Sequence, residues 1–274
     1  MFASAQILYF ISLTLDYCCY KLNFNYLRQY HFSVSESKHM RSKEKQEVTN
    51  ELLDGLPSKL RKTIVAQCEQ VHLTSGDILH ERGQGIDYIF YPLTGYISLV
   101  TTGTRHPPLE LCIIGNEGML GISNISGVQS APDRAVVQGS GTALRLSVKQ
   151  FQYQLKNFPL LLKRLNDYLY ILFVQGSQSL VCMRFHPIVS RLARWLLMTD
   201  DRAHSTHLNL THQFLADMLG VRRSGITVAA CLLKDKKLIS YTRGTIQILN
   251  RKGLEREACE CYQLMKGNYT NRLN

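Results

Sequence analysis

Two arginines and two hydroxyl side chains lie close together near the carboxyl end of the chain, at Arg222, Arg223, Ser224 and Thr227. A guanidinium group can donate two hydrogen bonds to O6 and N7 of guanine, and hydroxyl groups can reach other base edges. The residues before them suit a short helix and a tight turn. Ala216 is small enough for two helices to approach closely, and Gly220 can adopt the positive φ that a sharp turn requires. The spacing predicts a helix-turn-helix over residues 211–230.

The phase of the second helix supports this prediction. At 100° per residue, Ile226, Ala230 and Leu233 share one buried stripe. The residues expected on the opposite, exposed face are Ser224, Thr227, Val228 and Cys231, with Arg223 flanking them. We expect Arg223 to contact a base and Arg222 to contact a phosphate when this helix lies in the major groove. The alternative is an ordinary helical hairpin whose arginines are solvated.

A two-stranded wing is predicted after this helix. Residues 237–241 and 245–249 are rich in strand-forming side chains, and residues 242–244 suit a short hairpin turn. Arg243 at its tip can touch the sugar-phosphate backbone, or can simply be solvated. The predicted DNA-contacting residues are therefore Thr211, Arg222, Arg223, Ser224, Thr227 and Arg243.

The positive charge is concentrated in the same region. The formal net charge is +11, and residues 184–274 hold 15 Lys and Arg against 7 Asp and Glu. A polyanion such as DNA binds by releasing counterions in proportion to the phosphates neutralised, so this distribution favours DNA as a partner. No basic amphipathic stripe favours a membrane.

The eight cysteines lack the spacing of a disulfide framework or a zinc ribbon, which indicates a reducing cytoplasm. Cys259 and Cys261 form a close pair, but a metal site needs two further ligands that the sequence does not place nearby. Cys18 and Cys19 are adjacent and are not followed by the run of cysteines that an iron-sulfur cluster needs. The histidines share no tight spacing. We therefore expect no metal and no cofactor.

Residues 1–39 are predicted to be a poorly structured extension. The apolar run over residues 7–15 is about half as long as a membrane span, and it lacks the basic flank of a secretory signal. Met40 begins a polar lead-in to a helical pattern, so we expect Met40 to be the true start. A tether to a membrane or a partner is the competing interpretation.

Short strands separated by glycines fill the next part of the chain, after a helical segment at residues 52–69. Such a series predicts an antiparallel sandwich or roll. The expected strands are residues 71–74, 78–80, 88–91, 95–102, 109–114, 134–137 and 142–146.

This order of parts resembles the Crp/Fnr family of bacterial transcription regulators over residues 50–262. The resemblance rests on residues 76–79, a hairpin around Gly95, residues 118–122 and, most specifically, residues 211–249. It implies an α+β fold with an amino-terminal antiparallel, jelly-roll-like β-roll, a long dimerisation helix and a carboxyl-terminal winged helix-turn-helix. The domains expected after residue 39 are a sensor roll at 40–147, a linker and dimerisation helix at 148–184, a winged domain at 185–265 and a tail at 266–274.

Relatives in this family that bind a cyclic nucleotide hold its ribose with a carboxylate and its phosphate with an Arg-Ser pair. Here Met119 stands at the carboxylate position, and Arg134 is followed by Ala135. A buried ribose hydroxyl without its partner loses about 1 to 3 kcal/mol, so cyclic AMP is not expected to bind. The segment in which the resemblance places an unknown effector comprises Gly118, Met119, Leu120, Gly121 and Arg134. A surface or salt-bridged role for Arg134 is the alternative.

A long helix is predicted from Pro159 to the break at His186 and Pro187. Its apolar and small residues recur at alternating steps of three and four, which is a heptad seam. The seam comprises Leu162, Leu165, Leu169, Leu172, Gly176, Ser179 and Met183. We expect it to pair with a second copy across a twofold axis, although packing within one chain is the alternative.

The sequence thus predicts a cytoplasmic, homodimeric transcription regulator that binds an inverted-repeat operator, and that contacts RNA polymerase if it activates. A sensor module that regulates a protein partner without reading DNA is the alternative. The chain has no phosphate-binding glycine loop, metal triad or nucleophile elbow, so we expect no catalytic residues.

Overall fold

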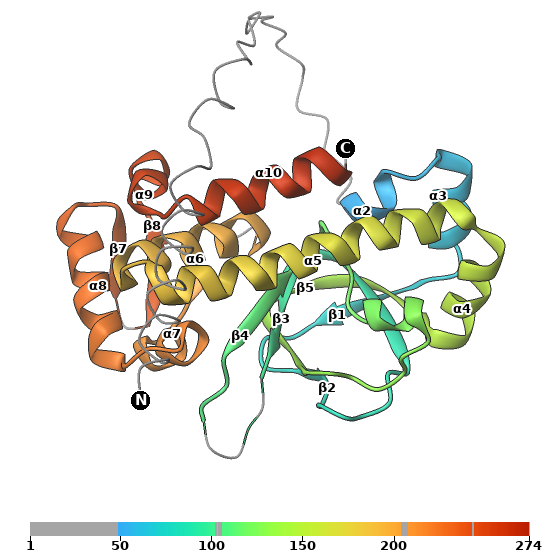
Figure 1. Cartoon of the computed structure of the whole chain (residues 1–274), viewed down its shortest axis with the longest axis horizontal. Helices are drawn as coiled ribbons and strands as arrows, with labels where there is room; N and C mark the ends of the chain where they lie inside the picture. The colour runs from blue at the N-terminus through green and yellow to red at the C-terminus, as the bar shows by residue number, and fades with distance from the viewer. Residues whose placement is uncertain (1–48, 102, 104–105, 204–207, 243, 274) are drawn as a thin grey trace, which may run out of the picture. The chain divides into compact units, whose positions relative to one another are not determined.

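An antiparallel sheet forms the amino-terminal part of the described chain (Figure 1). The computed structural model describes residues 49–101, 103, 106–203, 208–242 and 244–273, so the predictions for residues 1–39, Met40 and Arg243 lie outside it. The strand order is β1-β5-β3-β4, with β2 also paired to β5. The strands are β1 (Glu69–Leu73), β2 (Ile78–His80), β3 (Tyr88–Val100), β4 (Glu110–Ile114) and β5 (Arg134–Ser147).

The predicted hairpin around Gly95 is wrong. Residues on both sides of Gly95 belong to the single strand β3, and the register of β3 with β5 shifts between Thr94 and Tyr96. Gly95 has φ +73°, and a Cβ there would lie 2.3 Å from the carbonyl oxygen of Gly139. Only glycine fits such a bulge, which bends the strand without ending it. The two segments predicted on either side of residues 138–141 are likewise one strand, β5.

Short helices close the roll at both ends. Asn50 caps α2 by accepting a hydrogen bond from Leu53, and its amide donates to the carbonyl oxygens of Pro92 and Gly118. Ser147 and Gln150 form a capping box that starts α4 where β5 ends. These elements are α2 (Glu51–Asp54), α3 (Ser58–Val65), the 3₁₀ helix η1 (Ile122–Ser126) and α4 (Val148–Asn157).

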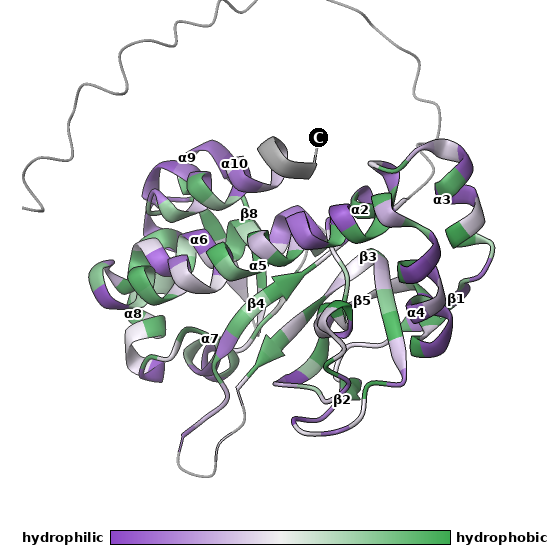
Figure 2. Ribbon diagram, turned by 45° about the vertical axis from the view of Figure 1, so that its right-hand side comes forward, coloured by the Kyte–Doolittle hydropathy of each residue, from purple (hydrophilic) through white to green (hydrophobic). Residues whose placement is uncertain are grey.

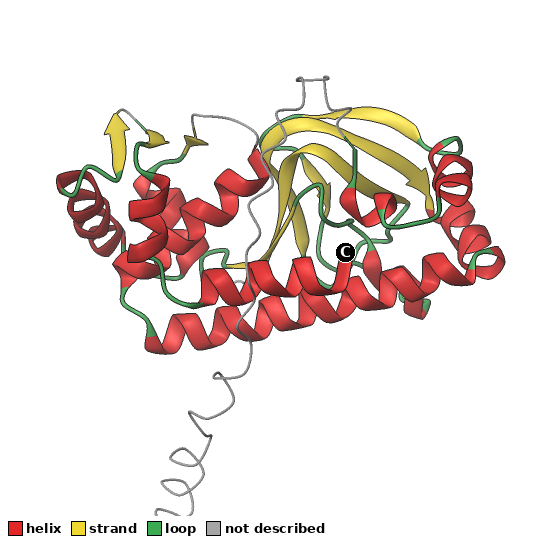
Figure 3. Cartoon of the chain, turned by 90° about the horizontal axis from the view of Figure 1, so that it is seen from above, coloured by secondary structure: helices red, strands yellow, loops and turns green. Residues whose placement is uncertain are grey.

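The long helix α5 (Pro159–Phe185) matches its prediction at both ends, with Pro159 in its first turn and extended backbone at His186. A second long helix, α10 (Cys261–Leu273), packs along it, and Figure 3 shows the two side by side across from the strands of the roll. The predicted tail over residues 266–274 is therefore helical as far as Leu273.

The winged domain begins after the break at Pro187. Its helices are α6 (Ile188–Ala203), α7 (His212–Leu219), α8 (Arg223–Asp235) and α9 (Arg251–Glu257). Its sheet has the order β6-β8-β7, with β6 (Leu208–Asn209), β7 (Ile239–Thr242) and β8 (Thr245–Ile248). The architecture thus confirms the predicted α+β fold with a roll, a long helix and a winged helix-turn-helix.

The roll and the winged domain share one hydrophobic core. Tyr96, Val100 and Ile113 of the roll belong to the same buried cluster as Trp195 and Leu196 of α6. Figure 2 shows hydrophobic residues along β3 and β4, the strands that contact α6. This continuous packing means that a change in the roll has a physical route to the winged domain. Within the described residues, no helix is long and apolar enough to cross a membrane.

Candidate nucleic-acid interface

The turn between α7 and α8 has the geometry that the sequence predicted. Thr211 caps α7, because its hydroxyl accepts a hydrogen bond from the backbone N–H of Phe214 at 3.1 Å. Gly220 ends α7 with φ +62°, and the backbone N–H groups of Gly220 and Val221 donate to the carbonyl oxygens of Asp217 and Ala216 in the last turn. Ala216 is buried where α7 and α8 contact each other. The turn therefore sets the angle at which α8 leaves the domain.

Burial along α8 follows the predicted phase. Ile226, Ala230 and Leu233 are buried in the shared core. The exposed residues include Arg222, Arg223, Ser224, Thr227, Val228 and Cys231. Arg222 is the residue that precedes the first turn, and Arg223 opens the helix. The fold therefore leaves both arginines, Ser224 and Thr227 exposed at the start of α8.

His212 links α8 to the wing. Its Nδ1 lies 3.0 Å from the Thr227 hydroxyl, and its ring stacks on Tyr241 of β7 with centroids 4.4 Å apart. Burial, together with the nearby charge of Arg223, lowers the pKa of His212 below its ordinary value of 6.5. The imidazole is consequently neutral at pH 7 and adds no charge to the exposed face. Its role is to hold the first turn of α8 against the wing.

The wing is a tight hairpin in which Thr242 pairs with Thr245. Gly244 in its turn has φ +85°, and its carbonyl oxygen accepts a hydrogen bond from the N–H of Leu210. Arg243, the predicted tip residue, lies outside the described residues. Gly244 is adjacent in space to Thr211, whose methyl group lies 3.9 Å from where a Cβ on Gly244 would stand.

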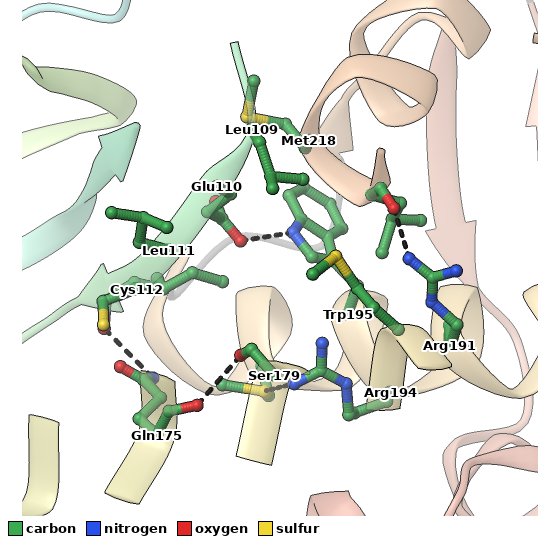
Figure 4. A pocket seen from close by; sticks show the side chains of 14 residues that line it. Leu109, Glu110, Leu111, Cys112, Gln175, Ser179, Arg191, Arg194, Trp195 and Met218 are labelled. Carbon is green, nitrogen blue, oxygen red and sulfur yellow. Dashed lines mark hydrogen bonds between the residues drawn. The ribbon is translucent and has the colours of Figure 1, made fainter. Parts of the chain in front are cut away.

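Polar contacts join α7 to α6 and α6 to the roll. Arg191 of α6 donates a hydrogen bond to the carbonyl oxygen of Leu219 at the end of α7 (Figure 4). Trp195 donates through its indole N–H to Glu110 of β4 at 2.6 Å, and Ser98 of β3 donates to the other carboxylate oxygen at 2.6 Å. The cavity around them has a volume of about 20 Å³, which is room for about one water molecule. Burial raises the pKa of Glu110 to about 7.

A buried ion pair makes a second connection. Arg202 near the end of α6 donates to Glu117 of the roll at 2.7 Å, and both side chains are buried. Arg202 also donates to the carbonyl oxygen of Met198 and lies over the ring of Tyr269. Removing one member of a buried pair leaves an uncompensated charge in a low-dielectric interior, so this contact strongly fixes the roll against α6.

The residues predicted to bind an effector take part in packing, backbone pairing and an ion pair within the described chain. Met119 and Leu120 are buried core side chains, and Leu120 pairs by backbone with Phe90. A Cβ on Gly118 would lie 2.1 Å from the Tyr168 hydroxyl of α5, so α5 packs directly onto this segment. Arg134 forms a salt bridge with Glu81 at 2.8 Å, which is the alternative that the sequence left open. The backbone around Gly121, with φ +95°, serves to start η1.

The predicted seam on α5 needs a correction. Leu165 and Leu172 are buried in their own chain, packed in one core with Leu52, Phe151 and Tyr168. Leu162, Gly176, Ser179 and Met183 are half-buried, and Leu169 is exposed. The exposed apolar face of α5 instead carries Phe173 and Leu180, whose exposed fractions are 70% and 64%. The cause is that the roll and α10 cover the side of α5 that carries Leu165 and Leu172.

Sequence reasoning missed the residues that join the roll to the winged domain. Trp195 was expected to be core, and it is, but its bond to Glu110 was not foreseen. Glu110 stands between Leu109 and Leu111 at the start of β4, and a lone charged residue there is expected to face solvent. The only hint of these contacts in the sequence was a carboxylate in an apolar strand, Glu110, followed by a second carboxylate at Glu117. Nothing in the sequence identified their partners, which lie 85 residues further along the chain.

Comparison with protein families identifies residues 190–257 as a Crp-like helix-turn-helix domain. The match covers α7, α8 and the wing, which are the elements that the geometry had already set apart. No curated protein sequence matches the chain.

Several solved structures are similar in fold to this chain. FixK2 from Bradyrhizobium japonicum has a TM-score of 0.60 at 12% identity, with 70% of this chain and 98% of that chain covered. The c-di-GMP responsive global regulator CLP from Xanthomonas campestris has a TM-score of 0.58 at 13% identity, covering 70% and 99%. A Crp/Fnr-family transcriptional regulator from Thermus thermophilus has a TM-score of 0.58 at 23% identity, covering 69% and 98%. These likenesses confirm the fold that the sequence resemblance implied.

Proposed function

We propose that this chain, a DNA-binding transcription regulator of the Crp/Fnr type, binds an inverted-repeat operator as a homodimer and reads it with the exposed face of α8. The observation that carries the proposal is the division of α8 into a buried apolar stripe and an exposed face that holds Arg222, Arg223, Ser224 and Thr227. A helix of this kind fits the major groove of DNA, where its first turn meets the base edges.

Each exposed residue has a distinct proposed task. Arg223 donates to guanine O6 and N7, while Ser224 and Thr227 reach neighbouring base edges or thymine methyl groups. Arg222, one residue before the helix, contacts a phosphate. Thr211 and Arg243 contact the sugar-phosphate backbone from the start of α7 and from the wing, which fixes the register of α8 without reading sequence.

The dimer is proposed to form through the exposed apolar face of α5. Large apolar side chains on that face are exposed at Leu169, Phe173 and Leu180, and Gly176 lies among them with no described atom within 4 Å of where its Cβ would stand. A second α5 related by a twofold axis would cover this patch, and glycine permits a close approach of the two backbones. Two α8 helices then face half-sites about one helical turn, or 34 Å, apart.

The roll is proposed to act as the regulatory part. It contacts the winged domain through Glu110, Glu117 and the shared core, so a conformational change in the roll would alter how α6 packs against it. Cyclic AMP is not the proposed effector, because Met119 stands where a carboxylate is needed and its side chain is buried. If the chain activates transcription, RNA polymerase is a further partner.

Binding to a selected duplex at increasing salt tests the proposal. We expect the affinity to fall steeply with salt, because Lys and Arg side chains displace condensed counterions. Arg223→Ala should weaken binding to the selected duplex, while Arg256→Ala, which changes an exposed arginine on α9, serves as the matched control. A dimer that binds a protein partner, but binds every duplex weakly and equally, would instead support a sensor that does not read DNA.

A further inference from the structure

Three cysteines and a histidine from distant parts of the chain meet where α5 ends. They are Cys182, His186, Cys259 and Cys261, and their ligand atoms all lie within 4.8 Å of one another. Cys182 lies in the last turn of α5 and His186 directly follows that helix. Cys259 lies between α9 and α10, and Cys261 begins α10. The sequence showed the pair at Cys259 and Cys261 without further ligands, and the fold supplies two.

We propose that Cys182, His186, Cys259 and Cys261 bind a Zn²⁺ ion in a closed tetrahedral site that fastens α10 to the end of α5. Zinc prefers four ligands of this kind, and three thiolates with one imidazole form one of its usual structural sets. Because all four positions are filled by the protein, none is left for a substrate, and the site is structural. The proposal does not depend on DNA binding.

The distances suit a tetrahedral ion. With Zn–S near 2.3 Å and Zn–N near 2.0 Å, ligand atoms around a tetrahedral zinc lie about 3.5 to 3.8 Å from one another. The sulfurs of Cys182 and Cys259 are 3.5 Å apart, and the sulfur of Cys261 is 3.4 Å from Nδ1 of His186. Contraction of the remaining pairs from at most 4.8 Å requires small side-chain rotations.

The groups around the ligands match a zinc site. Glu260 lies 3.0 Å from Nε2 of His186, so its carboxylate can accept a hydrogen bond from the N–H at that nitrogen and leave Nδ1 free for the metal. Gln178 of α5 donates through its amide to the sulfur of Cys261 at 3.0 Å, which favours the thiolate. All three cysteines are buried, which excludes water from the ligands.

Charge gives a second, independent reason. Arg194 is buried, its Nε has no hydrogen-bond partner among the described residues, and its terminal N–H groups point to the thioether sulfurs of Met198 and Met265. Three thiolates and one Zn²⁺ carry a net negative charge, which would partly compensate this guanidinium. Arg194 is close enough to Cys182 for their charges to interact.

The ion would cross-link two segments that are far apart in sequence. Metal binding would release the thiol protons to solvent and tie α10 to the break at His186 and Pro187, which is where the long helix gives way to the winged domain. We therefore expect the ion to raise the unfolding temperature of the whole described unit.

The test measures cobalt binding by the full-length chain, purified and stripped of metal by a chelator with its thiols kept reduced. We expect one Co²⁺ per chain, with the visible bands of tetrahedral cobalt and a thiolate charge-transfer band, and their loss when Zn²⁺ is added. Cys261→Ser should lower the affinity for cobalt by about 100-fold or more, whereas Cys231→Ser, which changes an exposed cysteine outside the group, should bind as the unchanged chain does.

A ligand-preserving variant guards against misfolding. Cys261→His should keep a tetrahedral spectrum with a weaker charge-transfer band, and His186→Gln should weaken binding while circular dichroism shows an intact fold. The proposal is overturned if the reduced chain binds no cobalt. It is equally overturned if the bands persist in folded Cys261→Ser, or if the isolated chain holds iron in place of zinc.

Discussion

The buried and exposed faces of α8 and of α5 were both predicted from the spacing of apolar residues. Residue by residue, the prediction agrees with the structure for α8 but not for α5. α8 packs against α6, α7 and β7, which are its neighbours in sequence, and its buried and exposed faces agree with its periodicity. α5 is covered by β4 of the roll on one side and by α10 from the end of the chain. A helix whose partners are local shows its faces in its own sequence. A helix packed by distant segments shares its apolar residues between partners that the sequence does not distinguish.

The largest expected effect tests whether the distant packing holds the molecule together. Arg202→Met leaves Glu117 as a buried charge without its partner and should lower the free energy of unfolding by about 3 to 5 kcal/mol. Urea unfolding followed by circular dichroism measures this change. The double variant with Glu117→Leu should recover most of the loss, because no charge is then left unpaired. A single variant as stable as the unchanged chain would mean that the pair adds little.

A second pair of variants separates the two faces of α5. Leu165→Ala removes a fully buried side chain and should lower the free energy of unfolding by about 2 to 5 kcal/mol. Phe173→Ala removes an exposed side chain of similar apolar character, so it should leave the stability of the monomer nearly unchanged and weaken the dimer. Sedimentation equilibrium and urea unfolding measure the two effects. Dimer loss in folded Leu165→Ala with none in Phe173→Ala would restore the seam that the sequence predicted.

The pH dependence of stability tests the contact between the roll and the winged domain at Glu110. Burial raises the pKa of Glu110 to about 7, so the folded state favours the protonated acid relative to the unfolded chain, whose carboxyl has the ordinary value of 4.5. Its contribution to stability is fully present below pH 4.5 and is lost as the pH rises through about 7. Glu110→Gln cannot ionise at this position. The stability of this variant relative to the unchanged chain should therefore rise from pH 5 to pH 8, and a constant difference would contradict the assignment.

The smallest expected effects distinguish two adjacent arginines on α8. Arg223→Ala should cost about 1 to 3 kcal/mol of binding and relax the preference at one base in each half-site. Arg222→Ala should weaken binding to all sequences about equally and reduce the slope of affinity against salt by about one contact. Fluorescence anisotropy with matched and substituted duplexes measures both. Equal weakening by Arg223→Ala on every duplex would assign Arg223 to a phosphate.

The sequence was informative where structure is decided locally. The positive φ of Gly220 and the end of α5 at His186 each follow from the chemistry of a few adjacent residues. The same reasoning was wrong at Gly95, because a glycine with positive φ suits a bulge as well as a turn, and only the pairing with β5 decides between them.

The rest depends on contacts between segments far apart in sequence. Cys182 and Cys259 are 77 residues apart, and Glu110 and Trp195 are 85 apart. The periodicity of residues within one helix or strand does not predict contacts between segments so far apart. The buried thiol group and the acid at the junction therefore became visible only when the fold placed their partners.

The measurement that tests the central claim most directly is selection of bound fragments from random double-stranded DNA by the full-length chain, repeated with Arg223→Ala. The account predicts a symmetric inverted repeat whose half-sites are about one helical turn apart, with the preference at one base per half-site lost in the variant. Selected DNA sequences that share no motif would contradict it, and so would the same motif selected by both proteins.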